Sequence, residues 1–451
     1  MARYDAIVMG AGQAGPGVAG AFAAEGRRVA LTEVDRLGGT CLNHGCRPTK
    51  ALRASARIAH LARRAGDFGV QTGDVTVDFA AVMRRMHDMI DDMRGGMEEW
   101  LAGEDRIDVF RSPSVFDGSS GGVHRVRVDG QTLESEQVYI DVGARASVPP
   151  IDGLDDVDYL TEVELLELTE LPTHLLVVGG GYIGLEFGQM FRRFGARVTV
   201  LAGGGVAARE DTDVSDALTQ ILTDEGVEIV GGRVSHVSPH TDGVAVETDG
   251  GDRVTGSHLL IATGRVPNGD RIGADAVGLA LDDAGYLQIN ERFETSVPGI
   301  WALGDVNGHG AFTHTAYQDT AILLDESRTV SGRITAYAMF TDPPLGRVGM
   351  TAAQARDSGR SVLHAQLPMS SVSRAILDSE TEGLMQILVD ADSEEFLGAA
   401  FLGMHGDDLA QIVGHAMQAG VRYSQIRDAL PIHPTVAEFI PTLLGALEPL
   451  D

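Results

Sequence analysis

Short apolar runs and stretches of small residues alternate near the start of the chain. Tyr4 to Met9 is an apolar run typical of a buried strand, and it leads directly into glycines. The small residues from Pro16 to Glu25 predict a helix, and Val29 to Thr32 predict a second strand that ends at Glu33. This order of strand, turn, helix and strand predicts a βαβ unit.

The same pattern returns roughly 170 positions later. Leu175 to Val178 predict a strand, Leu185 to Phe194 a helix, and Arg197 to Leu201 the next strand. The chain is therefore predicted to be an α/β protein with two Rossmann-like units.

Both predicted turns carry three glycines in the spacing GxGxxG. They are Gly10, Gly12 and Gly15 in the first turn, and Gly179, Gly181 and Gly184 in the second. Such glycines permit a tight turn and let a pyrophosphate approach the backbone at the helix N-terminus. Glu33 lies 18 residues past Gly15, close to the position of an acid that binds a ribose hydroxyl. Two such units suggest two dinucleotides and electron transfer between them.

Two later segments extend the nucleotide-binding pattern. Ile261 to Asn268 reads as an apolar strand that ends in a glycine turn, and Ile300 to Asp305 reads as a strand that ends on an acid. An acid at the carboxyl end of such a strand can bind a sugar-alcohol chain.

The remaining chain divides into a helical segment and a mixed C-terminal part. Residues 37–101 read as mostly helical, and the part from Ala336 mixes strands such as Leu384 to Val389 with helices such as Asp407 to Ala419. One helix carries a stripe of methionines, which we expect to pack inside the protein or at a dimer contact; they are Met83, Met86, Met89, Met93 and Met97.

From these patterns we expect four segments in three domains. They are a first nucleotide-binding segment (1–141), a second nucleotide-binding domain (142–264), the continuation of the first (265–334) and a C-terminal α+β domain (335–451).

Composition and charge narrow the possible partners. With 451 residues the chain is too long for one core. The net charge of −30 comes from 35 basic and 65 acidic residues, and such a surface repels nucleic acids and anionic lipid. No apolar run approaches the ~20 residues of a membrane helix, and no signal peptide is visible. We therefore expect a cytoplasmic protein that binds neither nucleic acid nor membrane.

Both cysteines of the chain, Cys41 and Cys46, lie in the segment GGTCLNHGCRPTK. Pro48 can occupy the first turn of a helix, which would put Cys46 at a helix N-terminus where a thiolate is stabilised. Arg47 and Lys50 add positive charge. A low-pKa thiol with a second thiol nearby is typical of a redox-active pair.

Two other interpretations of the cysteines are weaker. Zinc needs about four ligands, and only His44 and His60 are close in sequence, so we expect no metal site. Two inert core cysteines would not need a glycine loop and a cationic flank.

Five motifs together resemble one family. GGTCLNHGCRPTK, GGGYIGLEFG, ATGRVPN, IWALGD and HPTVAE occur in this order, and with them the whole chain resembles the class I pyridine nucleotide–disulfide oxidoreductases, the group of dihydrolipoamide dehydrogenase, glutathione reductase and mercuric reductase. The resemblance implies FAD in the first unit, NADPH or NADH in the second, and a homodimer built by the C-terminal domain.

The resemblance also implies individual cofactor contacts. Asp305 would hold the ribityl chain of FAD, and Tyr182 would cover the flavin face until the nicotinamide enters. Lys50 and Glu186 would form an ion pair beside the flavin. The other cofactor contacts correspond to Gly39, Thr40 and Gly264.

The implied catalytic cycle uses four side chains. Hydride passes from NAD(P)H to FAD and then to the Cys41–Cys46 disulfide, where Cys46 faces the flavin and Cys41 exchanges with substrate. His433, oriented by Glu438, would act as the acid–base group and reach the cysteines of the other subunit. Dehydrogenases of the group run this cycle in reverse.

The detailed sequence favours the mercuric-reductase-like branch. LEFGQMFRRFG, AFTHTAYQDT and FTDPPLGRVGMT resemble that branch, although the C-terminal cysteine pair of full-length mercuric reductases is absent, and Pro431 stands where the dehydrogenases usually have histidine. We expect reduction of a small disulfide, a metal ion or another oxidant. The alternatives are a dihydrolipoamide dehydrogenase, which could dock to a lipoyl protein, and a non-enzymatic redox sensor.

The preference for NADH or NADPH depends on the residues that follow the strand ending at Leu201. An acid there would favour NAD, but residues 202–204 are alanine and two glycines, and the nearest arginine in sequence is Arg209. Loss of the acid favours NADPH.

Overall fold

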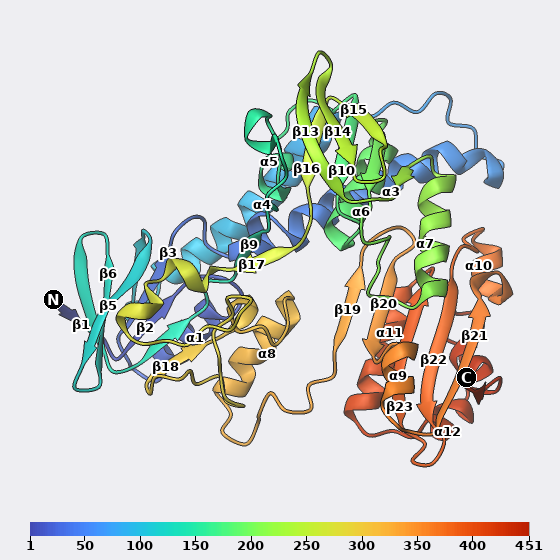
Figure 1. Cartoon of the computed structure of the whole chain (residues 1–451). Coiled ribbons are helices and arrows are strands. Elements are labelled where there is room, and N and C mark those ends of the chain that lie inside the picture. Colours follow the sequence, from blue (N-terminus) through green and yellow to red (C-terminus); the bar gives the residue numbers. More distant parts are fainter. Residues whose placement is uncertain (451) are drawn as a thin grey trace. The chain divides into compact units, whose positions relative to one another are not determined.

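The computed structural model describes residues 1–450, which form two compact units (Figure 1). The first unit contains Met1–Leu52, Ala80–Ser147 and Gly264–Arg333. The second contains Arg53–Phe79, Val148–Thr263 and residues 334–450.

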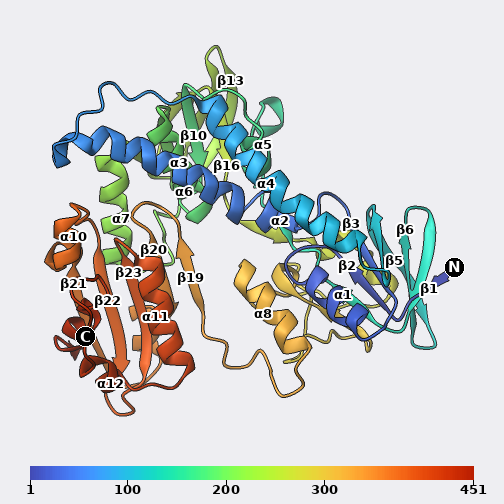
Figure 2. The same cartoon turned by 180° about the vertical axis from the view of Figure 1, so that it is seen from behind.

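A five-stranded parallel sheet forms the centre of the first unit. Its order is β18 (Ile300–Ala302), β8 (Val138–Ile140), β2 (Ala6–Met9), β3 (Val29–Glu33) and β4 (Ile107–Arg111). Every residue of β2 and β3 is buried, as expected for parallel strands covered on both faces. Helix α1 (Gly15–Ala24) packs on these two strands and is seen beside them in both views (Figures 1 and 2).

Smaller elements complete the first unit. A second sheet has the order β1 (Ala2–Arg3), β7 (Gln131–Ser135), β6 (Val123–Val128) and β5 (Ser114–Ser120), and β9 (Ala144–Ala146) pairs with β17 (Arg265–Pro267). The helices are α2 (Gly39–Asn43), α4 (Phe79–Ala102) and α8 (Thr313–Leu323), and α3 (Cys46–Arg64) begins in this unit and ends in the second.

The methionine stripe lies on α4 and changes environment along the helix. Met83 and Met86 are buried, Met97 packs against the core around β2 and β3, and Met93 is exposed. The stripe therefore supplies core packing at one end and reaches the surface at the other.

The second unit contains another parallel sheet. Its order is β12 (Glu228–Val230), β11 (Arg197–Leu201), β10 (His174–Val178) and β16 (His258–Ile261). The antiparallel strands β13 (Val234–His240), β14 (Gly243–Thr248) and β15 (Arg253–Gly256) follow β12. The helices of this part are α5 (Glu162–Leu165), α6 (Tyr182–Phe194) and α7 (Thr212–Asp224).

The C-terminal part of the second unit is a six-stranded antiparallel sheet. Its order is β19 (Ala336–Met339), β20 (Leu345–Gly349), β23 (Phe396–Leu402), β22 (Leu384–Asp390), β21 (Val362–Pro368) and β24 (Glu448–Pro449). Helix α11 (Gly406–Gln418) packs on β20 and β23. The other helices are α9 (Ala352–Asp357), α10 (Ser373–Leu377), α12 (Tyr423–Arg427) and α13 (Phe439–Leu444).

Buried ion pairs join the two sheets of the second unit. Arg193 on α6, only 5% exposed, contacts Asp342 beyond β19 and also Glu225, at 2.7 Å. Arg347 on β20 is 1% exposed and pairs with Glu210 and Asp211, at 2.6 and 2.8 Å. Because separated partners would leave buried charges uncompensated, these pairs hold the two sheets together.

The predicted fold class is confirmed. Both glycine-bearing βαβ units are present on parallel sheets, and the C-terminal part is an antiparallel sheet with helices.

Candidate functional site

The two cysteines lie on consecutive helices of the first unit. Cys41 is buried in α2, whereas Cys46 is the first residue of α3 and is exposed. A side chain at Gly39 would come within 2.7 Å of the Gly12 backbone. Glycine in the left-handed region (φ 57°) therefore lets the cysteine loop pack tightly on the first nucleotide turn.

The environment distinguishes the two thiols. Both are free. A hydrogen bond to Cys46 and burial raise the pKa of Cys41, and the charge of Cys46 adds to this effect. Cys46 lies at the N-terminus of a 19-residue helix whose first turn has no acid, and the helix dipole there favours a thiolate. The arrangement favours a proton on Cys41 and the negative charge on Cys46.

Thr313 also contacts the cysteine pair, and the sequence did not reveal this residue. It is the first residue of α8, and its hydroxyl lies 3.3 Å from the Cys46 sulfur. Its hydroxyl also hydrogen-bonds Cys41 and thereby offsets part of the rise that the Cys46 hydrogen bond and burial cause in the pKa of that thiol. Thr315 fixes the start of the helix, because its hydroxyl donates to the Phe312 carbonyl at 2.7 Å. The acidity of both thiols is therefore sensitive to one hydroxyl.

The first glycine turn has the shape that a dinucleotide needs. A Cβ at Gly10 would lie 2.2 Å from the Asp141 carbonyl oxygen, and one at Gly15 would lie 2.1 Å from the Gly10 carbonyl oxygen. Glu33 ends β3, is buried, and accepts a hydrogen bond from the Ala11 amide at 2.9 Å. These residues fit a nucleotide whose pyrophosphate approaches α1 and whose ribose lies near Glu33.

Asp141 directly follows β8 and contacts the first glycine turn. Its Oδ2 accepts hydrogen bonds from the amides of Gly15 (2.7 Å) and Ala14 (3.2 Å) at the start of α1. Burial raises its pKa well above the usual range, and the nearby charges of Asp305 and Asp319 add to the rise. Sequence reasoning gave Asp141 no role, although an acid directly after a buried parallel strand was the available signal.

Arg265 links two residues that the sequence predicted to contact the cofactor. It lies 3.9 Å from the Asp305 carboxylate and donates to the Thr40 hydroxyl at 3.4 Å. Burial raises the pKa of Asp305, and Arg265 opposes that rise. Gly264 precedes the arginine with φ of 124°. Thr40 and Asp305 therefore lie on either side of one guanidinium.

The second glycine turn repeats the construction of the first. A Cβ at Gly179 would lie 2.2 Å from the Ala262 carbonyl oxygen, and one at Gly184 would lie 2.3 Å from the Gly179 carbonyl oxygen. A Cβ at Gly181 would meet no atom within 4 Å. Tyr182 begins α6 and is 38% exposed. The residues of this turn also fit a dinucleotide.

Lys50 and Glu186 belong to different units. Lys50, the only lysine of the chain, is half-buried on α3. Glu186 is buried on α6 and accepts a hydrogen bond from the Phe340 amide at 2.8 Å. Their expected ion pair stays a prediction.

His433 and Glu438 form a close pair near the C-terminus. Nδ1 of His433 lies 2.9 and 3.2 Å from the two carboxylate oxygens of Glu438. Since a carboxylate only accepts, Nδ1 carries the hydrogen and Nε2 is left as the basic nitrogen. The His433 side chain is 72% exposed, whereas that of Glu438 is 10% exposed. A fixed carboxylate thus orients an accessible imidazole.

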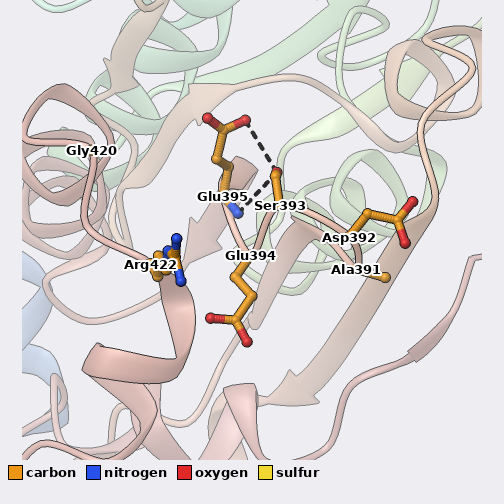
Figure 3. A pocket seen from close by; sticks show the side chains of 7 residues that line it. All are labelled: Ala391, Asp392, Ser393, Glu394, Glu395, Gly420 and Arg422. Atoms are coloured by element: carbon orange, nitrogen blue, oxygen red, sulfur yellow. Dashed lines mark hydrogen bonds between the residues drawn. The ribbon is translucent and has the colours of Figure 1, made fainter.

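A polar recess at the turn between β22 and β23 has different chemistry (Figure 3). Among its lining residues, the Ser393 hydroxyl donates to the Glu395 carboxylate at 3.2 Å and accepts from the Glu395 amide at 3.4 Å. It is lined by Ala391, Asp392, Ser393, Glu394, Glu395, Gly420 and Arg422. Neither cysteine nor His433 lines it, so the redox chemistry is elsewhere.

Residues 1–450 contain neither a candidate metal cluster nor a helix that could span a membrane. No group of three or more His, Cys, Asp or Glu side chains within this range could hold a metal ion. No helix in the same range is both long and apolar enough to cross a membrane.

Comparison with known proteins identifies the family of the chain. The pyridine nucleotide-disulphide oxidoreductase family matches residues 4–320, and the dimerisation domain of the same family matches residues 335–444. The probable pyridine nucleotide-disulfide oxidoreductase RclA of Escherichia coli is 34% identical over 460 residues, which cover 99% of this chain and 100% of that protein. The structure of the HOCl-induced flavoprotein disulfide reductase RclA has a TM-score of 0.89, covering 98% of this chain and 99% of that one.

Two other relatives are named for different activities. A mercuric reductase of Streptomyces lividans is 33% identical over 455 residues, covering 96% of this chain and 94% of that protein. A dihydrolipoyl dehydrogenase of Bacillus subtilis is 29% identical over 461 residues, covering 97% and 96%. The chain therefore belongs to the pyridine nucleotide-disulphide oxidoreductase family and is a flavoprotein disulfide oxidoreductase.

Proposed function

We propose that this protein is an NAD(P)H-dependent, FAD-containing reductase whose Cys41–Cys46 pair passes two electrons to a small disulfide, a metal ion or another small oxidant. The observation that carries the proposal is the asymmetric thiol pair. One thiol is buried with a raised pKa, and the other lies at a helix N-terminus next to the Thr313 hydroxyl.

The first unit supplies the residues that would hold FAD. The glycine turn would receive the pyrophosphate, Glu33 the ribose and Asp305 the ribityl chain. The flavin, when bound, relays two electrons from the nicotinamide to the cysteine pair. The residues assigned to FAD are Gly10, Gly12, Gly15, Glu33, Gly39, Thr40, Lys50 and Asp305.

The second unit supplies the residues that would hold the nicotinamide cofactor. Its glycine turn repeats the close backbone approaches of the first, and Tyr182 is exposed at the start of α6. The residues assigned to this cofactor are Gly179, Gly181, Tyr182 and Gly184, whereas Gly264 belongs to a flavin-type segment and to the first unit.

The acceptor step uses the two thiols and one imidazole. Cys41 gives its proton to His433, and its sulfur bonds to one sulfur of an acceptor disulfide while the other sulfur leaves and takes that proton. Cys46 then attacks the Cys41 sulfur, which reforms the Cys41–Cys46 disulfide and releases the second acceptor sulfur as a thiolate. Two electrons pass from the pair to the acceptor.

The His433–Glu438 pair would serve a second copy of the chain. The C-terminal part matches a dimerisation domain, and the exposed imidazole is available to a partner. We propose a cytoplasmic homodimer in which His433 of one subunit acts on the cysteines of the other. The four segments 1–141, 142–264, 265–334 and 335–451 remain our proposed functional division.

Metal ions belong among the acceptors to be tested first. A structure of the RclA relative, 34% identical with a TM-score of 0.89, is a Cu(II) complex. With Cu(II), the Cys41 thiol and the Cys46 thiolate would become the disulfide and release one proton, while two copper ions would each take up one electron.

Steady-state turnover of the FAD-loaded protein tests the proposal. NADH and NADPH are each combined with lipoamide, glutathione disulfide, Cu²⁺, Hg²⁺ and a quinone, and dihydrolipoamide is tested with NAD⁺. Turnover with a metal ion or small disulfide that is lost in Cys41→Ser and Cys46→Ser supports the proposal. Fast and reversible lipoamide chemistry would instead make this a dihydrolipoamide dehydrogenase. A single reduction without sustained turnover would indicate a sensor.

A further inference from the structure

The two nucleotide-binding units differ at one equivalent position. In the first unit Glu33 lies 18 residues past the last glycine of the turn, and in the second Ala202 lies 18 residues past Gly184. An acid at this position binds the adenosine ribose 2′-hydroxyl and would repel a 2′-phosphate. The second unit therefore lacks the group that favours NAD.

An arginine that is distant in sequence lies at this position in the fold. Ala202 donates from its amide to the Val230 carbonyl at 2.8 Å, which joins the segment after β11 to the segment after β12. A Cβ placed on Gly203 would lie 2.9 Å from Cα and 3.0 Å from Cγ of Arg233. The Arg233 stem therefore packs directly on the Gly203 backbone, and glycine is needed there.

The backbone of Arg233 is fixed, although its side chain is exposed. Its amide donates to the Asp249 carboxylate at 2.9 Å, and its carbonyl accepts from the Asp249 amide at 2.8 Å. Gly232, with φ of 84°, forms the turn before it.

No carboxylate among residues 1–450 pairs with the Arg233 guanidinium. That is informative in a chain with 65 acidic and 35 basic residues, because most arginines of such a surface have an acid within reach. In the same unit, Arg193 and Arg197 do pair with carboxylates, those of Glu225 and Glu228.

The surroundings leave room for a phosphate group. Gly203 and Gly204 are exposed, and a Cβ on Gly204 would meet nothing within 4 Å. A guanidinium matches a phosphate with two parallel hydrogen bonds, which is why arginine is favoured at such sites. We propose that Arg233 binds the 2′-phosphate of NADPH and makes the second unit selective for NADPH. This inference rests on the proposed function, in which that unit binds the nicotinamide cofactor.

Arg209, the nearest arginine in sequence, is the natural rival. Burial raises the pKa of Tyr337 on β19, and Arg209 lies close enough to that phenol to oppose the rise. The side chain that packs on Gly203 is that of Arg233. Replacing each arginine separately distinguishes the two.

Calorimetric titration of the FAD-loaded full chain tests the proposal without turnover. The probes are adenosine 2′,5′-bisphosphate and adenosine 5′-monophosphate, and the proteins are the wild type, Arg233→Gln and the control Arg209→Gln. We expect Arg233→Gln to bind the bisphosphate about ten- to hundredfold more weakly than the wild type does, with an unchanged affinity for the monophosphate. Arg209→Gln should bind both probes with the affinity of the wild type. Binding of the bisphosphate to wild type should weaken with added salt.

Three results would overturn the assignment. Equal affinity of the wild type for both probes would show that the second unit does not select for the 2′-phosphate. An unchanged affinity of Arg233→Gln for the bisphosphate would show that Arg233 does not bind that phosphate. If neither probe binds and neither NADH nor NADPH reduces the protein, the proposed function fails as well. In the first two cases NADH or NADPH still reduces the protein, so the two failures can be told apart.

Discussion

The hydroxyl of Thr313 lies 3.3 Å from the sulfur of Cys46, although 267 residues separate them in the chain. A thiolate only accepts hydrogen bonds, so when Cys46 is charged the threonine must donate. The contact adds to the helix N-terminus as a stabiliser of negative charge on Cys46.

Removing this hydroxyl should make the Cys46 thiolate harder to form. A hydrogen bond to a charged group contributes about 1.5–3 kcal/mol, which corresponds to about one to two pH units. We expect Thr313→Val to shift the pH midpoint of the thiolate–flavin absorbance of the reduced protein upward by about this amount, and Thr313→Ser to restore it. Thr219→Val, which loses one hydrogen bond from a hydroxyl to the backbone within α7 and touches neither cysteine, is the control. If the pH midpoint of Thr313→Val equals that of the wild type, the Thr313 hydroxyl does not stabilise the Cys46 thiolate.

Single serine replacements should separate the roles of the two cysteines. Cys46→Ser should bind FAD but lack the long-wavelength absorbance after reduction, because the group facing the flavin cannot ionise. Cys41→Ser should show that absorbance even before reduction, since Cys46 then has no disulfide partner. Absorbance that survives in Cys46→Ser would reverse the assignment of the two thiols.

The His433–Glu438 pair should act on thiol exchange alone. General acid–base catalysis contributes about 10²–10⁴-fold, so His433→Gln should slow acceptor reduction by about 10² or more while reduction of the flavin by the nicotinamide keeps its rate. Glu438→Gln should give a smaller loss, because the imidazole is still present but is no longer held by a carboxylate at 2.9 Å. Rapid-reaction measurement of the two half-reactions checks this, and equal slowing of both would contradict it.

The contribution of the buried Asp141 to the stability of the folded chain should fall as pH rises. Its pKa is raised in the folded chain, so the folded state holds the proton more tightly than the unfolded state does. Its contribution to stability is then present below about pH 4, the unfolded value, and is lost as pH rises through the raised pKa. Asp141→Asn should therefore become increasingly stable relative to wild type as pH rises.

Denaturant unfolding of the FAD-loaded protein at several pH values measures this difference. Asp270, whose pKa Arg145 lowers, supplies a control of opposite sign, since its contribution is present above the unfolded value and lost as pH falls. A constant offset between Asp141→Asn and wild type at every pH would mean that Asp141 stays ionised.

The buried ion pairs of Arg347 should be needed for the stability of the second unit. Arg347→Leu leaves Glu210 and Asp211 without their cation, and breaking one side of a buried pair costs about 3–5 kcal/mol. Arg374→Leu, which breaks a solvent-accessible pair with Asp378 at the end of the same helix, should cost less than about 1 kcal/mol. Denaturant unfolding compares the two, and similar losses would show that Arg347 has no special role.

Local sequence predicted the glycine turns correctly because their constraints are local. Gly10 and Gly179 each approach the carbonyl of a neighbouring strand so closely that any side chain would collide, and glycines spaced around a turn between a strand and a helix indicate that requirement. The same holds for Cys46, whose position at a helix start follows from its neighbours.

The missed residues are those that tertiary packing brings in. Thr313 reaches Cys46, and Arg233 reaches Gly203, from elements that no spacing rule connects. Asp141 was visible as an acid after a strand, but its raised pKa depends on burial among Asp305 and Asp319. Periodicity likewise predicted the methionine stripe but not that Met86 is buried while Met93 is exposed.

Counting thiols tests the central claim most directly, because the chain has only two cysteines. The FAD-loaded, air-oxidised protein is reduced anaerobically with one equivalent of NADPH or NADH, unfolded, and titrated with a thiol reagent. We predict a rise from zero to two thiols per chain, since both electrons end on the Cys41–Cys46 disulfide. Two thiols both before and after reduction would show that the cysteines never form the disulfide, and the proposed redox pair would be wrong.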